Sequence, residues 1–305
     1  MLLDTAAMYF RAFYGVPDTV RSPGGEPVNA VRGLLDMIAK LVTDFEPTEL
    51  VACWDDEWRP KWRVALIPSY KAQRVASETE AGSVEEVPHL LTAQVPVIRD
   101  VLDALGIPIV GAVDHEADDV IGTLTHRARI PVDVVTGDRD LFQVVDDSHD
   151  VRVIYTGRGM SKLEILTDTA LKAKYGITPQ QYADFAVMRG DPSDGLPGVA
   201  GVGEKTAVSL LNSWGDLDGI VTAATDESSA MAATIRSKIL AAADYLAVAP
   251  KVVEVVRDLE LSPFDAQIRP LTPEQSNILD RLSTKWGLSG SLQRARHALE
   301  SAAAA

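Results

Sequence analysis

The chain has 305 residues, with 29 lysines and arginines against 44 aspartates and glutamates, so its formal net charge is −15. Hydrophobic residues make up 46% and charged residues 24%, which is an ordinary globular composition and excludes a disordered chain. One cysteine, Cys53, excludes an intrachain disulfide and an all-cysteine zinc site. No apolar stretch reaches eighteen residues, so we expect a soluble, cytoplasmic protein outside the membrane. The acidic balance also argues, at first sight, against a nucleic-acid partner.

The first half of the chain alternates short apolar runs with segments of helical period. Strands are predicted at 2–4, 49–55, 107–112 and 132–138, followed by a hairpin over 151–157 and 162–167. Helices are predicted between the strands, at 5–13, 30–43, 90–105 and 117–128. This alternation predicts an α/β fold, with a mostly parallel central sheet that carries helices on both faces.

The segment 58–96 fits neither pattern and is far longer than the usual connection between a strand and a helix. Its stretch 61–74 contains Lys61, Arg63, Lys71 and Arg74 but no acidic residue. The stretch 77–86 that follows contains four glutamates and no basic residue. A basic stretch in so acidic a protein indicates a specific role rather than an accident of composition.

From about residue 168 the strand pattern fades and helices predominate. Helices are predicted at 178–190, 204–214, 229–249, 272–286 and 290–304. We therefore predict two domains, an α/β domain over 1–167 and a helical domain over 168–305.

Acidic residues fall where the predicted strands end. Seven carboxylates follow four strands, and two more open the helical half: Asp4, Asp55, Glu116, Asp118, Asp119, Asp138 and Asp140, then Asp191 and Asp194. Ligands of open α/β sheets bind at the carboxyl ends of the strands, where these acids would repel one another unless cations neutralise them. Oxygen-only ligands suit Mg²⁺ or Mn²⁺, and two such ions about 3.5–4 Å apart form a clamp for attack on a phosphodiester.

Single acids at strand ends are also common as helix caps or solvated loop residues. Independent caps would not require pairs such as Glu116 with Asp118 or Asp138 with Asp140, so we favour the metal site. His115 and Cys53 are interpreted as structural residues. Without the nine carboxylates of the proposed site the formal charge is only −6, and bound divalent ions would draw a phosphate to that edge.

A glycine-rich stretch over 195–207 resembles a nucleotide-binding loop only superficially. Glu204 separates Gly203 from Lys205, so the P-loop pattern is not met. Two helices joined by a glycine hairpin are the alternative, with backbone amides that hold a DNA phosphate without reading sequence. An ordinary helix–turn–helix connection explains the spacing about equally well.

Taken in order, the motifs resemble the bacterial 5′-nuclease family, which comprises flap endonucleases and the 5′–3′ exonuclease domain of DNA polymerase I. The resemblance covers roughly residues 1–290 and implies a stand-alone, monomeric member. The motifs are DTAAMYFRAF from Asp4, GGEPVNAV at 24–31, WD at 54–55, SYKAQR at 69–74, HEADDVIG at 115–122, TGDRDLFQ at 136–143 and GDPSDGLPGVAGVGEKTA at 190–207. Thr5 stands where the family usually has glycine and Gly195 where it usually has asparagine. Neither departure removes a carboxylate.

The resemblance implies a metal-dependent hydrolase that acts in replication and repair on DNA with 5′ flaps, nicks, gaps or free 5′ ends, near the nucleoid. It places a first Mg²⁺ or Mn²⁺ at Asp4, Asp55, Glu116 and Asp118, with Asp119 nearby, and a second at Asp138, Asp140, Asp191 and Asp194. Lys71 and Arg74 would contact the scissile phosphate from the base of a helical arch, through which a free 5′ strand passes. The glycine hairpin would become a helix–three-turn–helix element that grips duplex DNA and also binds K⁺.

The DNA-binding residues implied by the resemblance are Arg11, Lys61, Arg63, Gly198, Gly201, Gly203, Lys205 and Thr206. Phe10 or Tyr14 would stack on a base beside the cut, although packing within a helix explains them equally well. Two other functions stay open, a non-catalytic binder of DNA junctions and a ribonuclease of the related acidic α/β type. The full carboxylate set argues against the first, and the glycine hairpin and helical half argue against the second.

Overall fold

A six-stranded sheet organises the first half of the chain in the computed structural model, which describes residues 1–79 and 82–304. The strands follow the order β5-β2-β1-β6-β7-β8, and all neighbours are parallel except β7 and β8. The mostly parallel sheet and its final hairpin are therefore confirmed. The strands are β1 (Leu2–Asp4), β2 (Val51–Cys53), β5 (Ile109–Val110), β6 (Val132–Thr136), β7 (Val151–Tyr155) and β8 (Glu164–Leu166).

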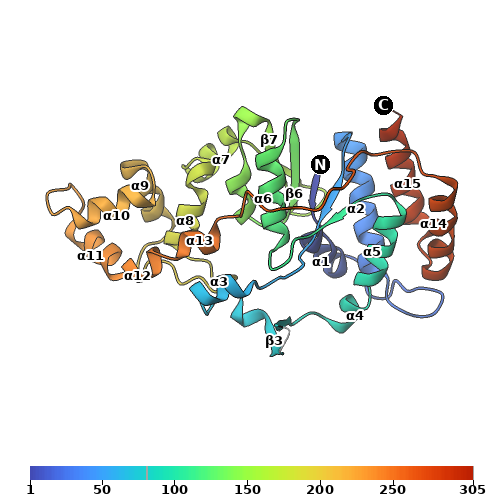
Figure 1. The fold of residues 1–305 in the computed structure, drawn as a ribbon, viewed down its shortest axis with the longest axis horizontal. Helices are drawn as coiled ribbons and strands as arrows, with labels where there is room; N and C mark the ends of the chain where they lie inside the picture. Colours follow the sequence, from blue (N-terminus) through green and yellow to red (C-terminus); the bar gives the residue numbers. More distant parts are fainter. Residues whose placement is uncertain (80–81, 305) are drawn as a thin grey trace.

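Helices cover both faces of this sheet, as the sequence predicts (Figure 1). Successive strand residues point to opposite faces, so Leu2 packs in one core and Leu3 in the other. The core of Leu2 includes helix α6 (Ala117–Arg127), whose Val120 and Ile121 are fully buried. The core of Leu3 lies under helices α1 (Thr5–Gly15), α2 (Asn29–Phe45), α5 (Val95–Ala104) and α15 (Ser289–Ala303). This arrangement brings the carboxyl ends of β1, β2, β5 and β6 to one edge.

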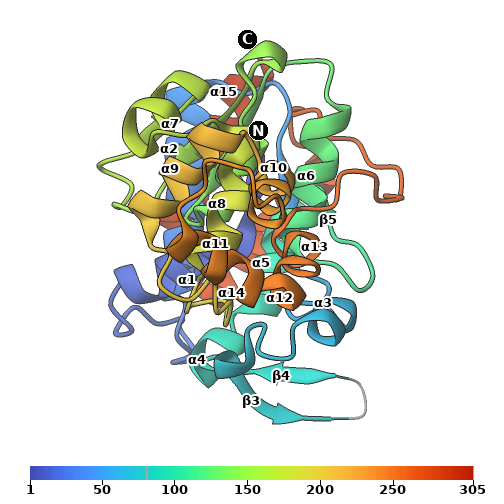
Figure 2. The same cartoon turned by 90° about the vertical axis from the view of Figure 1, so that its left-hand side faces the viewer.

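The segment 58–96 is helical only in part, which corrects the expectation of a helical arch. Its elements are α3 (Lys61–Leu66), the 3₁₀ helix η1 (Ala72–Arg74), the antiparallel pair β3 (Val75–Glu78) and β4 (Ser83–Glu85), and α4 (His89–Thr92). Pro60 and Pro88 lie at the N-caps of α3 and α4, because a proline cannot sit inside a helix without removing a hydrogen bond. The β3–β4 hairpin projects from the rest of the molecule (Figure 2).

A helical region extends from the sheet on the α6 side, and its core is continuous with that face through Phe142, Tyr182 and Phe185. The single helix predicted over 229–249 is wrong: the structure divides this stretch between three helices, the last of which begins at Ala249 with Pro250 in its first turn. The elements are η2 (Asp140–Val144), η3 (Asp147–His149), α7 (Asp168–Tyr175), η4 (Pro179–Gln181), α8 (Tyr182–Arg189), α9 (Glu204–Trp214), α10 (Leu217–Thr225), α11 (Ala233–Ala241), α12 (Ala243–Leu246) and α13 (Ala249–Val253).

The last two helices return to the opposite face of the sheet. Helix α14 (Pro273–Trp286) begins with a capping box between Thr272 and Gln275, and α15 packs along α2. Residues 273–303 thus lie far from α9–α12 in the molecule (Figure 1). The division into domains at 167 and 168 stays a prediction. Among the residues described, no helix combines the length and the apolar character needed to cross a bilayer.

Candidate active site

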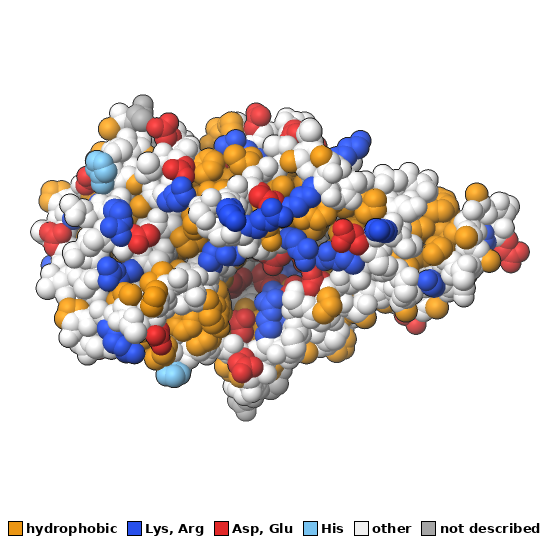
Figure 3. All heavy atoms as spheres, turned by 180° about the vertical axis from the view of Figure 1, so that it is seen from behind, with side chains coloured by type: hydrophobic (Ala, Val, Ile, Leu, Met, Phe, Trp, Pro, Cys, Tyr) orange, Lys and Arg blue, Asp and Glu red, His pale blue; other side chains and the backbone are white. Residues whose placement is uncertain are grey.

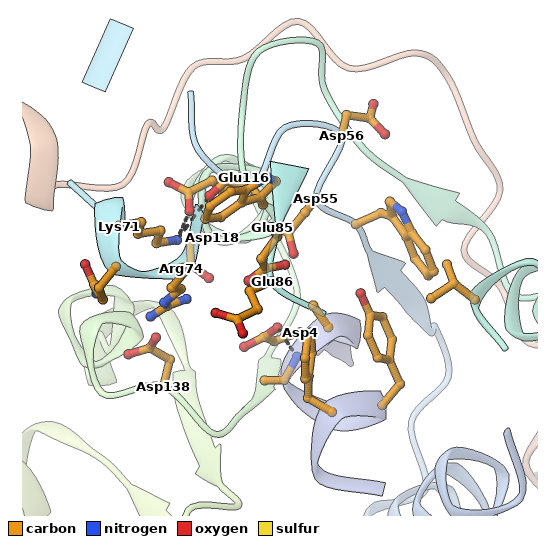
Figure 4. A pocket seen from close by; sticks show the side chains of 18 residues that line it. Asp4, Asp55, Asp56, Lys71, Arg74, Glu85, Glu86, Glu116, Asp118 and Asp138 are labelled. Carbon is orange, nitrogen blue, oxygen red and sulfur yellow. Dashed lines mark hydrogen bonds and ion pairs between the residues drawn. The ribbon is translucent and has the colours of Figure 1, made fainter. Parts of the chain in front are cut away.

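A cavity of about 710 Å³ opens at the carboxyl edge of the sheet. Its wall combines carboxylates from four strand ends with two basic side chains and several aromatic rings (Figure 4). The charged residues that line it are Asp4, Asp55, Asp56, Glu85, Glu86, Glu116, Asp118 and Asp138, with Lys71 and Arg74. The structure therefore brings together five of the nine predicted metal ligands in one cavity.

Asp4 is held in place by the junction of β1 and α1. Its carboxylate accepts the Ala7 amide at 3.1 Å, as a helix N-cap, and the Thr136 hydroxyl at 2.6 Å. Burial raises the pKa of Asp4 to about 7, a rise that the Thr136 hydrogen bond opposes and the nearby Asp55 carboxylate adds to. Asp55 in turn accepts the Ala117 amide at 2.7 Å, at the start of α6. Backbone amides thus fix two carboxylates in the cavity.

Asp118 and Asp140 are two further buried carboxylates that neighbouring acids affect. Burial raises the pKa of Asp118, and the carboxylates of Asp4 and Asp138 raise it further. Burial also raises the pKa of Asp140, and the carboxylates of Asp138, Asp194 and Asp191 raise it further. Asp138 is therefore close enough to act on both groups, and a cation bound between them would relieve the repulsion.

The loop after α8 carries two more of the predicted ligands. Asp191 accepts the Ser193 amide at 2.8 Å and lies 3.3 Å from the Arg189 guanidinium. Asp194 forms an ion pair with Arg74 at 2.6 Å. The loop is thus tied directly to the base of the 58–96 segment.

Asp119 does not line the cavity, which corrects its assignment to the metal site. Its carboxylate is fully buried, receives the Arg63 guanidinium at 2.7 and 2.8 Å and accepts the Val256 amide at 2.9 Å. Arg63 is itself only 2% exposed, so the prediction that it contacts DNA is also wrong. These two residues form a buried ion pair behind the cavity.

A smaller cavity of about 550 Å³ adjoins the first and shares Asp138 with it. Phe10, Arg11 and Tyr14 line it, and Tyr14 is 72% exposed. The Arg11 Nε atom is buried without a hydrogen-bond partner in the described structure. Lys61, another predicted DNA contact, is exposed on α3. Arg11 thus lies beside Asp138, whereas Lys61 lines neither cavity.

The glycine hairpin joins α8 to α9. Gly198 has a φ of +68°, and a Cβ there would come within 2.6 Å of the Gly190 nitrogen, so this turn requires glycine. Gly203 is the N-cap of α9, and Gly201 and Lys205 are exposed beside it, with Thr206 half-buried. The Lys238 ammonium donates to the Gly201 carbonyl at 2.8 Å.

Both halves of the chain match models of one family. The 5′-3′ exonuclease N-terminal resolvase-like domain matches residues 1–176, and the C-terminal SAM fold of the 5′-3′ exonuclease matches residues 177–276. The chain belongs to the 5′-3′ exonuclease family. It is therefore a nuclease and a hydrolase, and the resemblance stated from its motifs is confirmed.

Relatives in this family include free-standing proteins and parts of larger ones. The chain is 57% identical over 295 residues to a 5′-3′ exonuclease of Streptomyces coelicolor, covering 96% of this chain and 98% of that protein. It is 48% identical to a 5′-3′ exonuclease of Mycobacterium tuberculosis, covering 98% and 97%. It is also 37% identical to DNA polymerase I of Mycobacterium bovis, covering 92% of this chain but 30% of the polymerase.

Solved structures support the fold of this family member. The T5 5′-exonuclease with bound zinc aligns with a TM-score of 0.64 at 15% identity, covering 99% of this chain and 98% of the other. The catalytic core of Rad2 in complex with a DNA substrate aligns with a TM-score of 0.61 at 15% identity, covering 99% and 91%. The mostly parallel sheet followed by a helical region is thus shared across distant proteins.

Three acidic residues of the cavity, namely Asp56, Glu85 and Glu86, were not predicted from the sequence. Asp56 directly follows Asp55 but points away from the other carboxylates (Figure 4), whereas Glu85 and Glu86 reach the cavity through the β3–β4 hairpin. No sequence signal reveals that fold-back, because the hairpin replaces an expected helix. The glutamates within 78–86 were the only sequence feature that indicated acidic side chains in this segment.

The donor set suits a hard divalent cation, because the predicted ligands that line the cavity are all carboxylates. Within residues 1–79 and 82–304, however, no three His, Cys, Asp or Glu side chains lie close enough together to hold an ion as they stand. Lys71, Arg63 and Arg74 pair with Glu116 and Asp194 instead. Basic side chains also gather around the acidic hollow on the surface (Figure 3).

Proposed function

We propose that this family member is a 5′-flap endonuclease with 5′–3′ exonuclease activity, which cleaves DNA phosphodiesters with two divalent ions. The observation that carries the proposal is the convergence of Asp4, Asp55, Glu116, Asp118 and Asp138 on one cavity beside Lys71 and Arg74. Such a combination offers ligands for cations and basic groups for a phosphate in the same place.

Mg²⁺ or Mn²⁺ would be held by two groups of carboxylates. Asp4, Asp55, Glu116 and Asp118 form the first group and Asp138, Asp140, Asp191 and Asp194 the second. Bound divalent ions would supply an activated water and stabilise the leaving oxygen. Lys71 and Arg74 place an ammonium and a guanidinium at the cavity wall, where they would neutralise the scissile phosphate. Lys71 also pairs with Glu116, and Arg74 with Asp194, so both side chains tie the segment 58–96 to the predicted metal ligands.

DNA would lie across both halves of the chain. The protein would act as a monomer, on the chromosome near the nucleoid. The duplex backbone would be held by the glycine hairpin, through Gly198, Gly201, Gly203, Lys205 and Thr206. The strand near the cut would be held by Arg11 and Lys61. The segment 58–96 would hold a free 5′ strand. T5 flap endonuclease and Rad2 have been crystallised with DNA, which supports DNA as the partner. The K⁺ ion at the glycine hairpin stays a prediction, and one carbonyl there, that of Gly201, already accepts the Lys238 ammonium.

The direct test is cleavage of a labelled DNA substrate with a 5′ flap. We expect cutting near the flap junction with Mg²⁺ or Mn²⁺ and none with a chelator, because the carboxylates alone cannot activate water. Matched substrates with a nick, a gap or an RNA flap establish the range of action. Binding without cleavage would favour the junction binder, and preferential cutting of the RNA flap would favour the ribonuclease.

Replacement of Lys205 by alanine is expected to weaken DNA binding without slowing the cut. The exposed ammonium at the N-terminus of α9 would contribute one phosphate contact, so the slope of log K against log salt should fall by about one. Fluorescence anisotropy with flap DNA measures the slope, and single-turnover cleavage at saturating enzyme measures the rate. Lys162→Ala, an exposed lysine in the β7–β8 loop, is the control. An unchanged salt slope in Lys205→Ala would remove this residue from the DNA path.

A further inference from the structure

Three donors from residues 63–71 surround the Glu116 carboxylate. The Arg63 Nη1 atom donates to Oε2 at 2.6 Å, and the Tyr70 hydroxyl donates to the same oxygen at 2.7 Å. The other oxygen, Oε1, accepts from the Lys71 ammonium. The two oxygens of one predicted metal ligand are therefore held by different residues.

Oε2 is held firmly because its donors are buried and fixed. The Arg63 guanidinium also binds both oxygens of Asp119 and donates to the Val252 carbonyl at 3.0 Å. Turning it away would leave a buried charge unpaired, which is strongly unfavourable. Tyr70 is 5% exposed, so its hydroxyl has little freedom either. Oε2 of Glu116 is therefore a permanent acceptor of these two donors.

Oε1 is held by a residue of a different kind. Lys71 lines the cavity, and apart from Glu116 its ammonium contacts the Trp58 carbonyl, at 3.4 Å, and the face of the Tyr70 ring, 5.2 Å from the ring centre. A lysine ammonium sits on a flexible stem and can rotate away, unlike the forked guanidinium of Arg63. The contact with Oε1, drawn between Lys71 and Glu116 in Figure 4, is therefore the exchangeable one.

The backbone of Lys71 adds an independent sign of function. Its φ is +49°, in the left-handed region that side chains other than glycine rarely adopt. Its amide donates to the Asp194 carbonyl at 2.9 Å, which helps to hold this conformation. Strained positions that the surrounding structure maintains are concentrated at active sites.

We propose that Arg63 and Tyr70 are positioning residues that hold Oε2 of Glu116, so that the Lys71 ammonium and a divalent cation compete for Oε1. The inference rests on the proposed function, because it takes Glu116 as a metal ligand. Lys71 would leave Oε1 once a cation is bound there, and its ammonium would then be free for a phosphate in the cavity. The lysine would thus become available only in a site that already contains its cation.

The test uses Ca²⁺ as the probe and isothermal titration calorimetry on the full chain. Lys71→Met is expected to bind Ca²⁺ about tenfold more tightly than the wild type, because a competing charge-assisted hydrogen bond is gone. The same variant is expected to lose Mg²⁺-dependent flap cleavage, so affinity and activity move in opposite directions. Lys61→Met removes the same charge from an exposed site on the same segment and should leave Ca²⁺ affinity within about twofold.

A second measurement follows the wild-type lysine itself. Acetic anhydride labelling, quantified by mass spectrometry, is expected to modify Lys71 more in Ca²⁺ than in chelator, while labelling of Lys61 stays constant. Equal or weaker Ca²⁺ binding by Lys71→Met would overturn the competition, as would protection of Lys71 by Ca²⁺. Absence of Ca²⁺ binding in the wild type as well would overturn the proposed metal site itself.

Discussion

Replacement of Asp140 by asparagine is expected to reduce flap cleavage by about 10³-fold or more while DNA binding is retained. Bound metal contributes several kcal/mol to the transition state, and each 1.4 kcal/mol or so is a factor of ten in rate. Asp140 lies among Asp138, Asp191 and Asp194, so its loss would disable the second group of ligands. Single-turnover cleavage measures the rate, and anisotropy with the same flap DNA in Ca²⁺ measures binding.

The unfolding temperature gives an independent check on the same variant. Burial and neighbouring carboxylates raise the pKa of Asp140, so its charged form opposes folding at neutral pH when no cation is present. Asp140→Asn should therefore melt at a higher temperature than the wild type in chelator, and gain less from added Mg²⁺. Asp100→Asn, on the exposed side of α5, should change neither cleavage nor melting. Wild-type turnover in Asp140→Asn would refute the two-metal mechanism.

Replacement of Arg63 by methionine is expected to lower the free energy of unfolding by about 3–5 kcal/mol. Breaking a buried ion pair leaves its partner charged and unpaired, and here two carboxylates, Glu116 and Asp119, would lose their shared partner. Urea denaturation of the full chain measures the loss. The double variant Arg63→Met/Asp119→Asn should lose less than the sum of the two single variants, because the second change removes the stranded charge.

An exposed ion pair provides the matched control for this prediction. Arg294 and Asp36 lie 2.7 Å apart, but their side chains are 57% and 43% exposed. Arg294→Met should cost less than about 1 kcal/mol, since solvent screens such pairs. Equal losses in Arg63→Met and Arg294→Met would contradict the structural role assigned to the buried pair.

The distribution of charge over the surface explains how so acidic a chain acts on nucleic acid. The formal charge of −15 averages over the whole surface, whereas several of the acids are gathered in one cavity. Lys71 and Arg74 line that cavity, and basic side chains surround it on the surface (Figure 3). With cations bound among the carboxylates, the same edge that repels phosphate would attract it.

The strands and the carboxylates that follow them were evident from the amino-acid sequence. Apolar runs alternating with helices require a parallel sheet, and the ends of parallel strands must meet at one edge. That reasoning placed Asp4, Asp55, Glu116, Asp118 and Asp138 correctly on one cavity. Asp4 ends β1, and Asp55 and Asp138 each lie two residues beyond the end of a strand, so their place at this edge follows from the strands alone.

Only the tertiary structure decided which neighbouring side chains face the cavity. Asp118 and Asp119 are adjacent in α6, and successive helical residues point about 100° apart, so one lines the cavity while the other is buried behind it. Arg63 lies on a helix of six residues, too short for a periodic pattern to predict its buried side. Its partners are 53, 56 and 189 residues away in the sequence, and such contacts form only when the segments pack together.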